Sequence, residues 1–340
     1  MIGIVSYGFY VPKFRIKIDD IASVWGKNPE DIKRSLVINE KAVAGLDEDS
    51  LTMGFEASSM ALSGLKIDRN DIGSVLFGSE TPPYSVNPAS TILGEFLGIG
   101  NNYLASDTQF ACKAATGAII TTIGQIASGA TSLGLVCGSD KANAATHDAL
   151  EYTAASGSVA LLLGQENLIL EILGFHSYSS DTPDFWRREG IRYPSHGGRF
   201  TGKPSYFRHI KEATSKVLEK TKLVPSDFAH AIFHMPNGKF PREIAREMGF
   251  SESQIETSLV VSMLGNSYTA SALMGLASVL EVAKPGQLIL MSSYGSGAGS
   301  DSFVFRVTKN IDSRRREFKK SILKKEYIDY STYLKFMNII

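Results

Sequence analysis

The stretch Asp107-Thr-Gln-Phe-Ala-Cys112-Lys-Ala-Ala-Thr-Gly117-Ala-Ile-Ile places a thiol between a short extended segment and a helix rich in small residues. The pattern predicts that this helix runs to about Ala130. Because the free N–H groups at the start of a helix stabilise an anion, this position favours the thiolate of Cys112 over the thiol. Cys112 is therefore the candidate nucleophile. The alternative is a buried core cysteine, since free cysteine packs as a small hydrophobe.

The composition indicates a water-soluble chain with a large core. Its 340 residues are 43% hydrophobic, enough for one large domain or two intimately packed ones. Lys plus Arg and Asp plus Glu each number 35, so no net field favours nucleic acid or an anionic membrane. No apolar run reaches the roughly 18 residues that a membrane span needs. The first residues predict a strand ending at Pro12 and not a signal peptide.

The two cysteines, Cys112 and Cys137, form neither a disulfide framework nor a metal motif. We therefore expect a reducing, cytoplasmic setting and no bound metal. Cys137 lies inside the apolar run Thr131–Asp140, where a structural role is expected.

Two successive segments of the chain follow the same plan. In each, an apolar strand ends at a polar residue and a proline, and a helix of small residues follows a loop. Glu80 and His234 end the two strands, and Cys112 and Asn266 open the two helices. We interpret this as an internal duplication. Alternation of strands and helices predicts largely parallel sheets covered by helices, with the four polar residues converging on one pocket.

These residues occur in an order that resembles the thiolase superfamily and, within it, hydroxymethylglutaryl-CoA synthases of the compact archaeal type. The motifs are Phe-Gly-Ser-Glu80-Thr, Cys112, Phe-His234-Met-Pro-Asn-Gly-Lys239, Gly-Asn266-Ser-Tyr-Thr-Ala-Ser and Ser296-Gly-Ala-Gly. The similarity covers about residues 1–307 and extends into the tail. It implies an α/β protein with a five-layer αβαβα fold built from two similar halves, residues 1–166 and 167–308, and a basic and aromatic tail, 309–340.

The resemblance also implies an activity: condensation of acetyl-CoA with acetoacetyl-CoA to (3S)-3-hydroxy-3-methylglutaryl-CoA and CoA, in the mevalonate route to isoprenoids. The residue types suit this chemistry. The Cys112 thiolate attacks the thioester, the Glu80 carboxylate removes a proton from the acetyl methyl, and His234 supports the charge that develops on the ketone oxygen. Water then hydrolyses the thioester on Cys112. No cofactor is needed, because the coenzyme A thioesters are the substrates.

The resemblance implies further contacts to coenzyme A and the acyl groups. Asn266 holds a water or an oxyanion together with the backbone amide of Cys112, and Lys239 meets the CoA phosphates. Thr153, Thr201 and Ser296 line the acyl site, and Arg199 lies near CoA. Arg242 approaches the substrate or CoA, although the family places its arginine one residue later, where this chain has Glu243. A homodimer, and a complex with an acetoacetyl-CoA thiolase and a small zinc-containing OB-fold protein, are also implied.

Two regions lie outside these motifs. The segment 177–204 is a long insertion that we expect to form a wall of the substrate tunnel. The tail carries Arg314-Arg-Arg, Lys319-Lys and Lys324-Lys ahead of several aromatic residues, and it predicts a contact with a partner or with the CoA phosphates.

Two other functions fit parts of the pattern. A β-ketoacyl synthase III-like or thiolase-type condensing enzyme shares Cys, His and Asn, but Glu80 and the presence of Ser296 in place of a second catalytic cysteine favour the synthase. A non-catalytic subunit of the same fold has no need of an intact Glu, Cys and His set.

Overall fold

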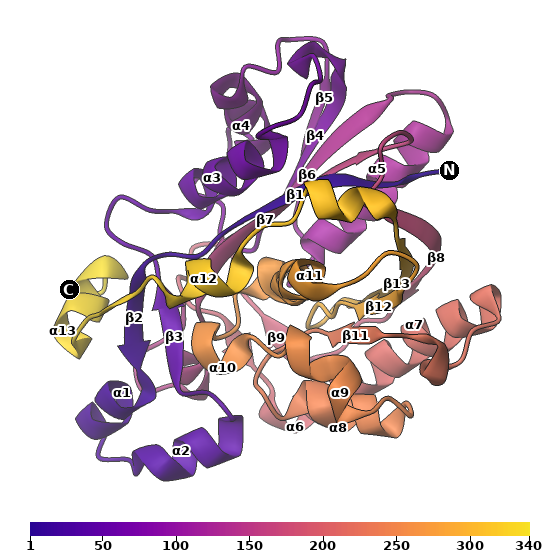
Figure 1. Ribbon diagram of the computed structural model, residues 1–340. Coiled ribbons are helices and arrows are strands. Elements are labelled where there is room, and N and C mark those ends of the chain that lie inside the picture. Colours follow the sequence, from indigo (N-terminus) through magenta and orange to yellow (C-terminus); the bar gives the residue numbers. More distant parts are fainter.

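The computed structural model describes residues 1–340 and contains two sets of strands, each covered by helices (Figure 1). The first half comprises β1 (Gly3–Tyr10), β2 (Phe14–Lys17), α1 (Ile18–Val24), α2 (Pro29–Leu36), β3 (Glu40–Val43), α3 (Ser50–Leu62), β4 (Ile72–Gly78), α4 (Ala89–Leu97), β5 (Leu104–Thr108), α5 (Ala114–Ala127), β6 (Leu133–Lys141) and β7 (Ser156–Gly164). The predicted helices and strands of this half are present, whereas the short strands β2 and β3 were not predicted.

The second half comprises β8 (Leu170–Ser179), β9 (Phe185–Trp186), β10 (Ser195–His196), α6 (Gly198–Thr201), a π-helical turn (Gly202–Phe207), α7 (Arg208–Thr221), β11 (His230–Phe233), α8 (Phe240–Glu247), α9 (Glu252–Ile255), α10 (Val261–Leu264), α11 (Ser271–Val282), β12 (Leu288–Ser292) and β13 (Gly299–Val307). Short 3-10 turns lie at Arg69–Asp71, Ala149–Tyr152, Pro225–Asp227, Glu256–Ser258, Tyr268–Ala270 and Lys309–Ser313.

The strand order is the same in both halves. The first runs β5-β4-β6-β7-β1 and the second β11-β12-β13-β8, so β4 matches β11, β6 matches β12, β7 matches β13 and β1 matches β8. The second half lacks a counterpart of β5. Short antiparallel pairing of β1 with β8, at Gly3 with Glu171 and Ile4 with Leu170, joins the halves into a nine-stranded sheet.

The expectation of largely parallel sheets is wrong. In the nine-stranded sheet, only β4 with β5, β4 with β6, and β11 with β12 pair in parallel, and the other five adjacent pairs are antiparallel. The parallel strands are linked through helices, whereas a loop without an α-helix joins β6 to β7, and another joins β12 to β13. A return without a crossover helix gives antiparallel neighbours.

Helices form three layers around the two strand sets. Helix α3 packs on β1, β6 and β7, and α7 packs on β8 and β13 on the outer face of the other half. The small-residue helices α5 and α11 lie between the halves, where their side chains share one hydrophobic core. This confirms the five-layer α/β fold. The sandwiching explains why β7, Ser-Gly-Ser-Val-Ala-Leu-Leu-Leu-Gly, is buried along its whole length.

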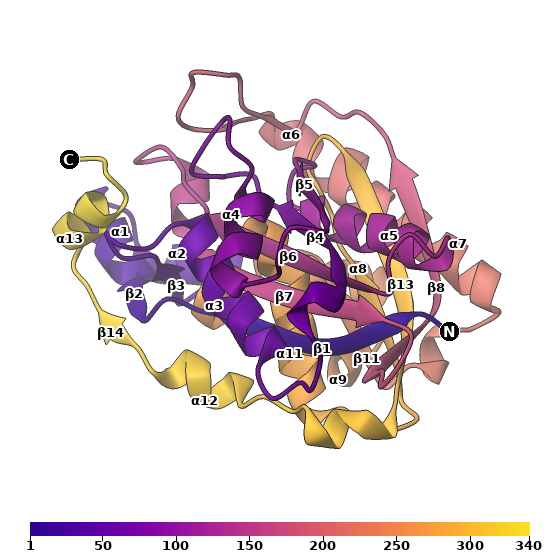
Figure 2. The same cartoon turned by 90° about the horizontal axis from the view of Figure 1, so that it is seen from above.

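The tail packs against its own chain. It contains α12 (Phe318–Leu323), β14 (Glu326–Tyr327) and α13 (Tyr330–Phe336), and β14 extends the small sheet of β2 and β3 (Figure 2). Arg315 donates to the carbonyls of Leu280 and Ala283 at the end of α11, and Arg316 donates to the carbonyl of Met60 near the end of α3. These arginines therefore bind helix carboxyl termini, which carry negative partial charge.

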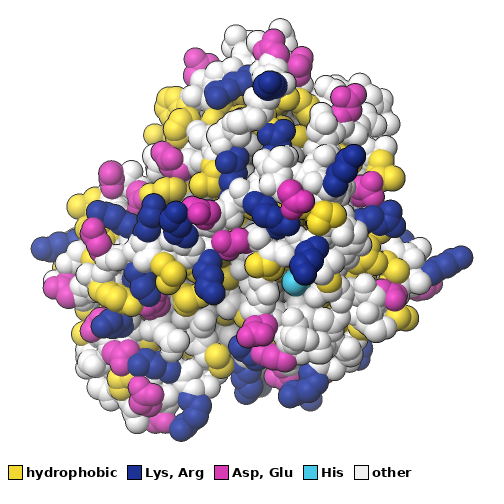
Figure 3. All heavy atoms as spheres, in the orientation of Figure 1, with side chains coloured by type: hydrophobic (Ala, Val, Ile, Leu, Met, Phe, Trp, Pro, Cys, Tyr) yellow, Lys and Arg dark blue, Asp and Glu magenta, His cyan; other side chains and the backbone are white.

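No helix in the structure combines the length and apolar character required to cross a bilayer. Basic and acidic side chains alternate over the face seen in Figure 3, without a large area of one sign.

Candidate active site

The thiol and the carboxylate are brought together by close packing of β4 against α5. A side chain at Gly78, the last residue of β4, would have its Cβ only 2.5 Å from the amide nitrogen of Ala115. Only glycine allows this approach, which places Glu80, two residues further on, beside the loop that precedes α5. Cys112 lies in that loop, only 6% exposed, directly after Ala111, whose φ of 48° turns the chain sharply.

The Glu80 carboxyl group and the Cys112 thiol lie close enough to change each other's acidity. Burial is the main reason that the pKa of Glu80 rises to about 8, with a further contribution from Asp140. Burial also raises the pKa of Cys112 well above its usual value, and the charge of Glu80 adds to this effect.

The prediction of a thiolate in the free protein is therefore wrong. Desolvation and two neighbouring carboxylates outweigh the start of α5, which begins two residues beyond the sulfur at Ala114. The resting thiol is protonated and needs a base when it attacks. Glu80 is within reach to serve as that base.

Asp140, which the sequence analysis did not single out, fixes the loop that carries Glu80. It lies fully buried near the end of β6, and its Oδ1 accepts hydrogen bonds from the Ser79 hydroxyl (2.9 Å), the Glu80 amide (2.8 Å) and both donors of Thr81. Its Oδ2 accepts from the amide of Thr269 in the other half (2.9 Å). One carboxylate thus connects the Glu80 loop to the segment before α11. An acidic residue at the end of an apolar strand, the pattern that selected Glu80, was the available signal.

His234 follows β11 and is almost completely buried. Its amide donates to the carbonyl of Ser292 (2.9 Å), and its carbonyl accepts from the Tyr206 hydroxyl (2.7 Å), so the backbone is held on both sides. Burial lowers the pKa of His234 to about 3. The imidazole is therefore neutral at pH 7, and its Nδ1 has no hydrogen-bond partner. A neutral imidazole can donate one hydrogen bond to a developing oxyanion.

Asn266 is joined to the first half by backbone bonds: its amide donates to Thr153 (2.7 Å), and its carbonyl accepts from Ala155 (3.0 Å). Its side-chain oxygen accepts from the amide of Tyr268 (3.0 Å), which leaves the amide nitrogen as a donor. We expected Asn266 and Cys112 to occupy equivalent positions before their helices, but the two positions differ by three residues. Cys112 lies two residues before α5, whereas Asn266 lies five before α11, because the 3-10 turn Tyr268–Ala270 intervenes.

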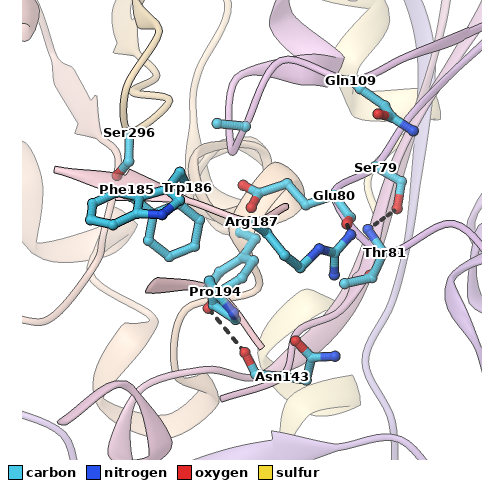
Figure 4. A pocket seen from close by; sticks show the side chains of 12 residues that line it. Ser79, Glu80, Thr81, Gln109, Asn143, Phe185, Trp186, Arg187, Pro194 and Ser296 are labelled. Atoms are coloured by element: carbon cyan, nitrogen blue, oxygen red, sulfur yellow. Dashed lines mark hydrogen bonds between the residues drawn. The ribbon is translucent and has the colours of Figure 1, made fainter. Parts of the chain in front are cut away.

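Two adjoining cavities meet at this site. The thiol cavity, about 270 Å³, is lined by Cys112, His234, Asn266, Thr153, Thr201 and Ser296, together with Leu36, Ala149, Leu150, Asp184, Phe185, His196, Gly198, Pro236, Asn237, Phe240 and Tyr268. The carboxylate cavity, about 200 Å³, is lined by Glu80 with Ser79, Thr81, Gln109, Ala111, Asn143, Phe185, Trp186, Arg187, Pro194, Tyr268 and Ser296 (Figure 4).

Phe185, Tyr268 and Ser296 line both cavities and form the partition between them. Glu80 lines one cavity and Cys112 the other, yet each affects the pKa of the other across this boundary. The carboxyl group and the sulfur therefore act on the same small volume, although each opens mainly into its own cavity.

The insertion 177–204 forms walls of both cavities, as expected, and is more ordered than the sequence suggested. It contains β9, β10 and α6. Buried Asp184 anchors it by accepting hydrogen bonds from the Tyr294 hydroxyl (2.6 Å) and from the Gly297 amide (2.8 Å) of the glycine-rich loop. His196, which the sequence motifs do not include, lines the thiol cavity, and its Nε2 lies 3.2 Å from the Asp148 carboxylate.

Three predicted binding residues do not line either cavity. Lys239 is exposed beside Asn237 and Phe240, which do line the thiol cavity, so it lies near the rim. Arg199 is exposed on α6, next to Gly198. Arg242 is held by the carbonyl of Gly238 (2.7 Å) and by Glu252 (2.9 Å), away from the cavity lining.

Lys113, the residue after the nucleophile, ties the loop to the second half. Its ammonium group is buried, lies 3.1 Å from the buried carboxylate of Asp301 on β13, and sits 4.0 Å from the centre of the Phe110 ring. Thr116 donates to Oδ2 of Asp301 and Ser177 to Oδ1, so both oxygens of this carboxylate are hydrogen-bonded. No group of three or more His, Cys, Asp or Glu side chains is arranged to hold a metal ion.

Known proteins are similar to this chain at two levels. Residues 218–307 match the family model for the C-terminal part of 3-oxoacyl-[acyl-carrier-protein] synthase III. The whole chain superimposes on a solved structure of MvaS in complex with 3-hydroxy-3-methylglutaryl coenzyme A, with a TM-score of 0.90 at 24% identity over 99% of this chain and 91% of the other. The fold is thus a thiolase-like α/β fold.

Sequence comparison gives the particular family. Hydroxymethylglutaryl-CoA synthase of Archaeoglobus fulgidus is 50% identical over 98% of both chains. The Methanopyrus kandleri enzyme of the same name is 49% identical over 98% of this chain and 94% of its own. The chain belongs to the hydroxymethylglutaryl-CoA synthase family, and it is an enzyme of that type.

The raised pKa of the thiol can be measured by alkylation. We expect the rate at which iodoacetamide modifies Cys112 to rise with pH through a midpoint above that of free cysteine, because only the thiolate reacts. Glu80→Gln removes one neighbouring charge and moves the midpoint down. Mass spectrometry of the Cys112 peptide gives both profiles. A wild-type midpoint below pH 8 would contradict the assignment.

Proposed function

We propose that this chain condenses acetyl-CoA with acetoacetyl-CoA to 3-hydroxy-3-methylglutaryl-CoA and CoA, through an acetyl group carried on Cys112. The observation that carries the proposal is the proximity of a protonated thiol to a carboxyl group of raised pKa, beside a cavity lined by Cys112, His234 and Asn266. Relatives named for this activity, at 46–50% identity, support it.

In the first step the enzyme acquires the acetyl group. The fraction of Glu80 that is ionised takes the thiol proton as the sulfur attacks the thioester carbonyl, since the thiol does not ionise unaided at neutral pH. The Cys112 amide and the Asn266 side chain are the proposed donors to the tetrahedral oxyanion. Free CoA leaves as the C–S bond of the substrate breaks, and it recovers the proton.

In the second step Glu80 removes a proton from the acetyl methyl group. A carboxylate whose pKa is about 8 is a stronger base than an ordinary one, although only about one tenth of it is ionised at pH 7. The enolate attacks the ketone carbon of acetoacetyl-CoA. Neutral His234 donates a hydrogen bond to the ketone oxygen as negative charge develops there, because the low pKa keeps the imidazole uncharged. The proton that Glu80 took from the methyl group passes to the alkoxide, which leaves Glu80 ionised again.

In the last step water hydrolyses the thioester that joins the product to Cys112, which makes the sequence irreversible in practice. No cofactor takes part, because thioester chemistry supplies both the leaving group and the acidity of the methyl protons.

We further propose that Lys239 and Arg199, both exposed near the thiol cavity, meet the CoA phosphates. Arg242 is the weaker candidate because Glu252 already pairs with it.

A β-ketoacyl synthase III-like or thiolase-type reaction is the second candidate, since the family model that matches residues 218–307 has the first of these names. The presence of Glu80 argues against this second reaction. A base beside the acetyl methyl group is what a methyl-deprotonating synthase requires, and Ser296 occupies the loop position where a thiolase has a second cysteine.

Separate variants distinguish acetylation from condensation. We expect wild-type protein incubated with acetyl-CoA to gain about 42 Da on the Cys112 peptide, Cys112→Ser to gain nothing, and Cys137→Ala, the matched control, to behave as wild type. Glu80→Ala is expected to retain some acetylation and to lose condensation by a factor of about 100 or more. Mass spectrometry and release of CoA are the measurements. Absence of any wild-type adduct would refute the mechanism.

We also propose that the enzyme works in the cytoplasm within the mevalonate route, as a homodimer, in a complex with an acetoacetyl-CoA thiolase and a small zinc-containing OB-fold protein. The family resemblance supports the complex, which would pass a weakly favoured product directly to the next site. The open edge of β5, with Leu104 and Phe110 exposed, supports self-association.

The assembly can be tested by light scattering after size-exclusion chromatography. We expect twice the mass of one chain, half that value for Leu104→Lys at the same concentration because the charge opposes edge pairing, and a heavier species when the two partner proteins are added. A wild-type monomer would contradict the dimer. Separate elution of all three proteins would contradict the complex.

A further inference from the structure

The carboxylate cavity includes the catalytic carboxylate in its lining but not the thiol. Its walls are rich in hydrogen-bonding groups, with the side chains of Ser79, Thr81, Gln109, Asn143 and Arg187 around Glu80 (Figure 4). At about 200 Å³ it has room for several water molecules, each of which would find two or more polar partners.

Glu80 belongs to the lining of this cavity. Its Oε1 is buried and has no hydrogen-bond partner within the protein. A buried carboxylate oxygen without a donor is costly, so this oxygen is a ready acceptor for the proton of a water that enters the site during the reaction. The other contacts hold Glu80 in place through its backbone: the amide donates to Asp140, and the carbonyl accepts from Arg187 (2.7 Å).

The carboxylate cavity has its own connection toward solvent. A neighbouring hollow of about 230 Å³ shares Thr81, Asn143 and Arg187 with it and includes Lys141 and Arg192. Trp186, on the wall of the carboxylate cavity, is 47% exposed. This route does not pass through the thiol cavity, from which Phe185, Tyr268 and Ser296 separate it.

The reaction needs such a route, if the function proposed above is correct. After condensation, the product fills the thiol cavity and the chain of coenzyme A occupies its entrance, whose lining includes the apolar side chains of Leu36, Leu150 and Phe240. Water for the hydrolysis must still reach the carbonyl carbon on Cys112. With the product in the thiol cavity and coenzyme A in its entrance, water cannot reach this carbon through the thiol cavity.

We propose that the carboxylate cavity is a hydration chamber that delivers the hydrolytic water to Glu80 and the Cys112 thioester. Glu80 takes a proton from this water as its oxygen forms the new C–O bond to the carbonyl carbon. The C–S bond breaks, and the proton passes from Glu80 to the sulfur. The net change is thioester plus water to carboxylic acid plus thiol, which restores the resting enzyme.

Filling the chamber tests this proposal. In Asn143→Phe, a ring replaces a polar group of the lining, while Asn101→Phe makes the same change at an exposed position. Acetylated enzyme is mixed with acetoacetyl-CoA, and mass spectrometry follows the covalent condensation product on Cys112. We expect Asn143→Phe to acetylate at a rate within about twofold of wild type and to hydrolyse the adduct about tenfold more slowly, so that the adduct accumulates. Hydrolysis at the wild-type rate would overturn the proposal.

A second measurement needs no substitution. Desulfo-CoA, which has no thiol to reverse acetylation, is added at saturation to the acetylated wild-type enzyme. We expect the hydrolysis of the acetyl group to change by less than about twofold, because water does not enter past coenzyme A. Suppression of hydrolysis by desulfo-CoA would overturn the route. If the wild type forms no acetyl adduct at all, the proposed function itself fails, whereas normal condensation with unaltered hydrolysis in Asn143→Phe removes only the chamber.

Discussion

The buried carboxylate of Asp140 is the constraint on which the active site depends. It binds the hydroxyl and amide donors of residues 79–81 after β4 and the amide of Thr269 before α11, so it fixes the Glu80 loop of one half relative to the other half. Its five donors offset the cost of burying the group. Glu80 is thereby held against Cys112 by its backbone, while its own carboxyl group remains free for chemistry.

The second half contributes its own connections across the interface. The Lys113–Asp301 ion pair and the backbone bonds between Asn266 and residues 153–155 join the halves on either side of Cys112. The backbone bonds of Asn266 require glycine at position 265. Its φ is 74°, and a Cβ at this position would lie only 2.7 Å from the Cβ of Ala155. The thiol therefore lies where two similar units meet, and each unit supplies part of its surroundings.

Much of this arrangement could be predicted from the sequence, because the relevant signals are local. Apolar strands that end at Glu80 and His234, and a small-residue helix after Cys112, indicate the two halves and their common pocket. The protonation of Cys112 could not be predicted in this way, since it depends on burial and on carboxylates that only the folded chain brings near. The antiparallel pairing of β6 with β7 was available from the connection between them, which has no α-helix, but the alternation of elements was given more weight. Asp140 and the partition formed by Phe185 and Tyr268 depend on tertiary packing across the halves.

The central claim is that a carboxyl group of raised pKa lies close enough to the thiol to act on whatever the sulfur carries. The most direct measurement is exchange of the acetyl methyl protons on Cys112 in deuterium oxide, without acetoacetyl-CoA, followed by mass spectrometry of the peptide. The account predicts that wild-type acetyl-enzyme gains up to about three mass units, whereas acetylated Glu80→Gln gains none over the same time. Equal exchange in both proteins would show that Glu80 is not the base and would contradict the account.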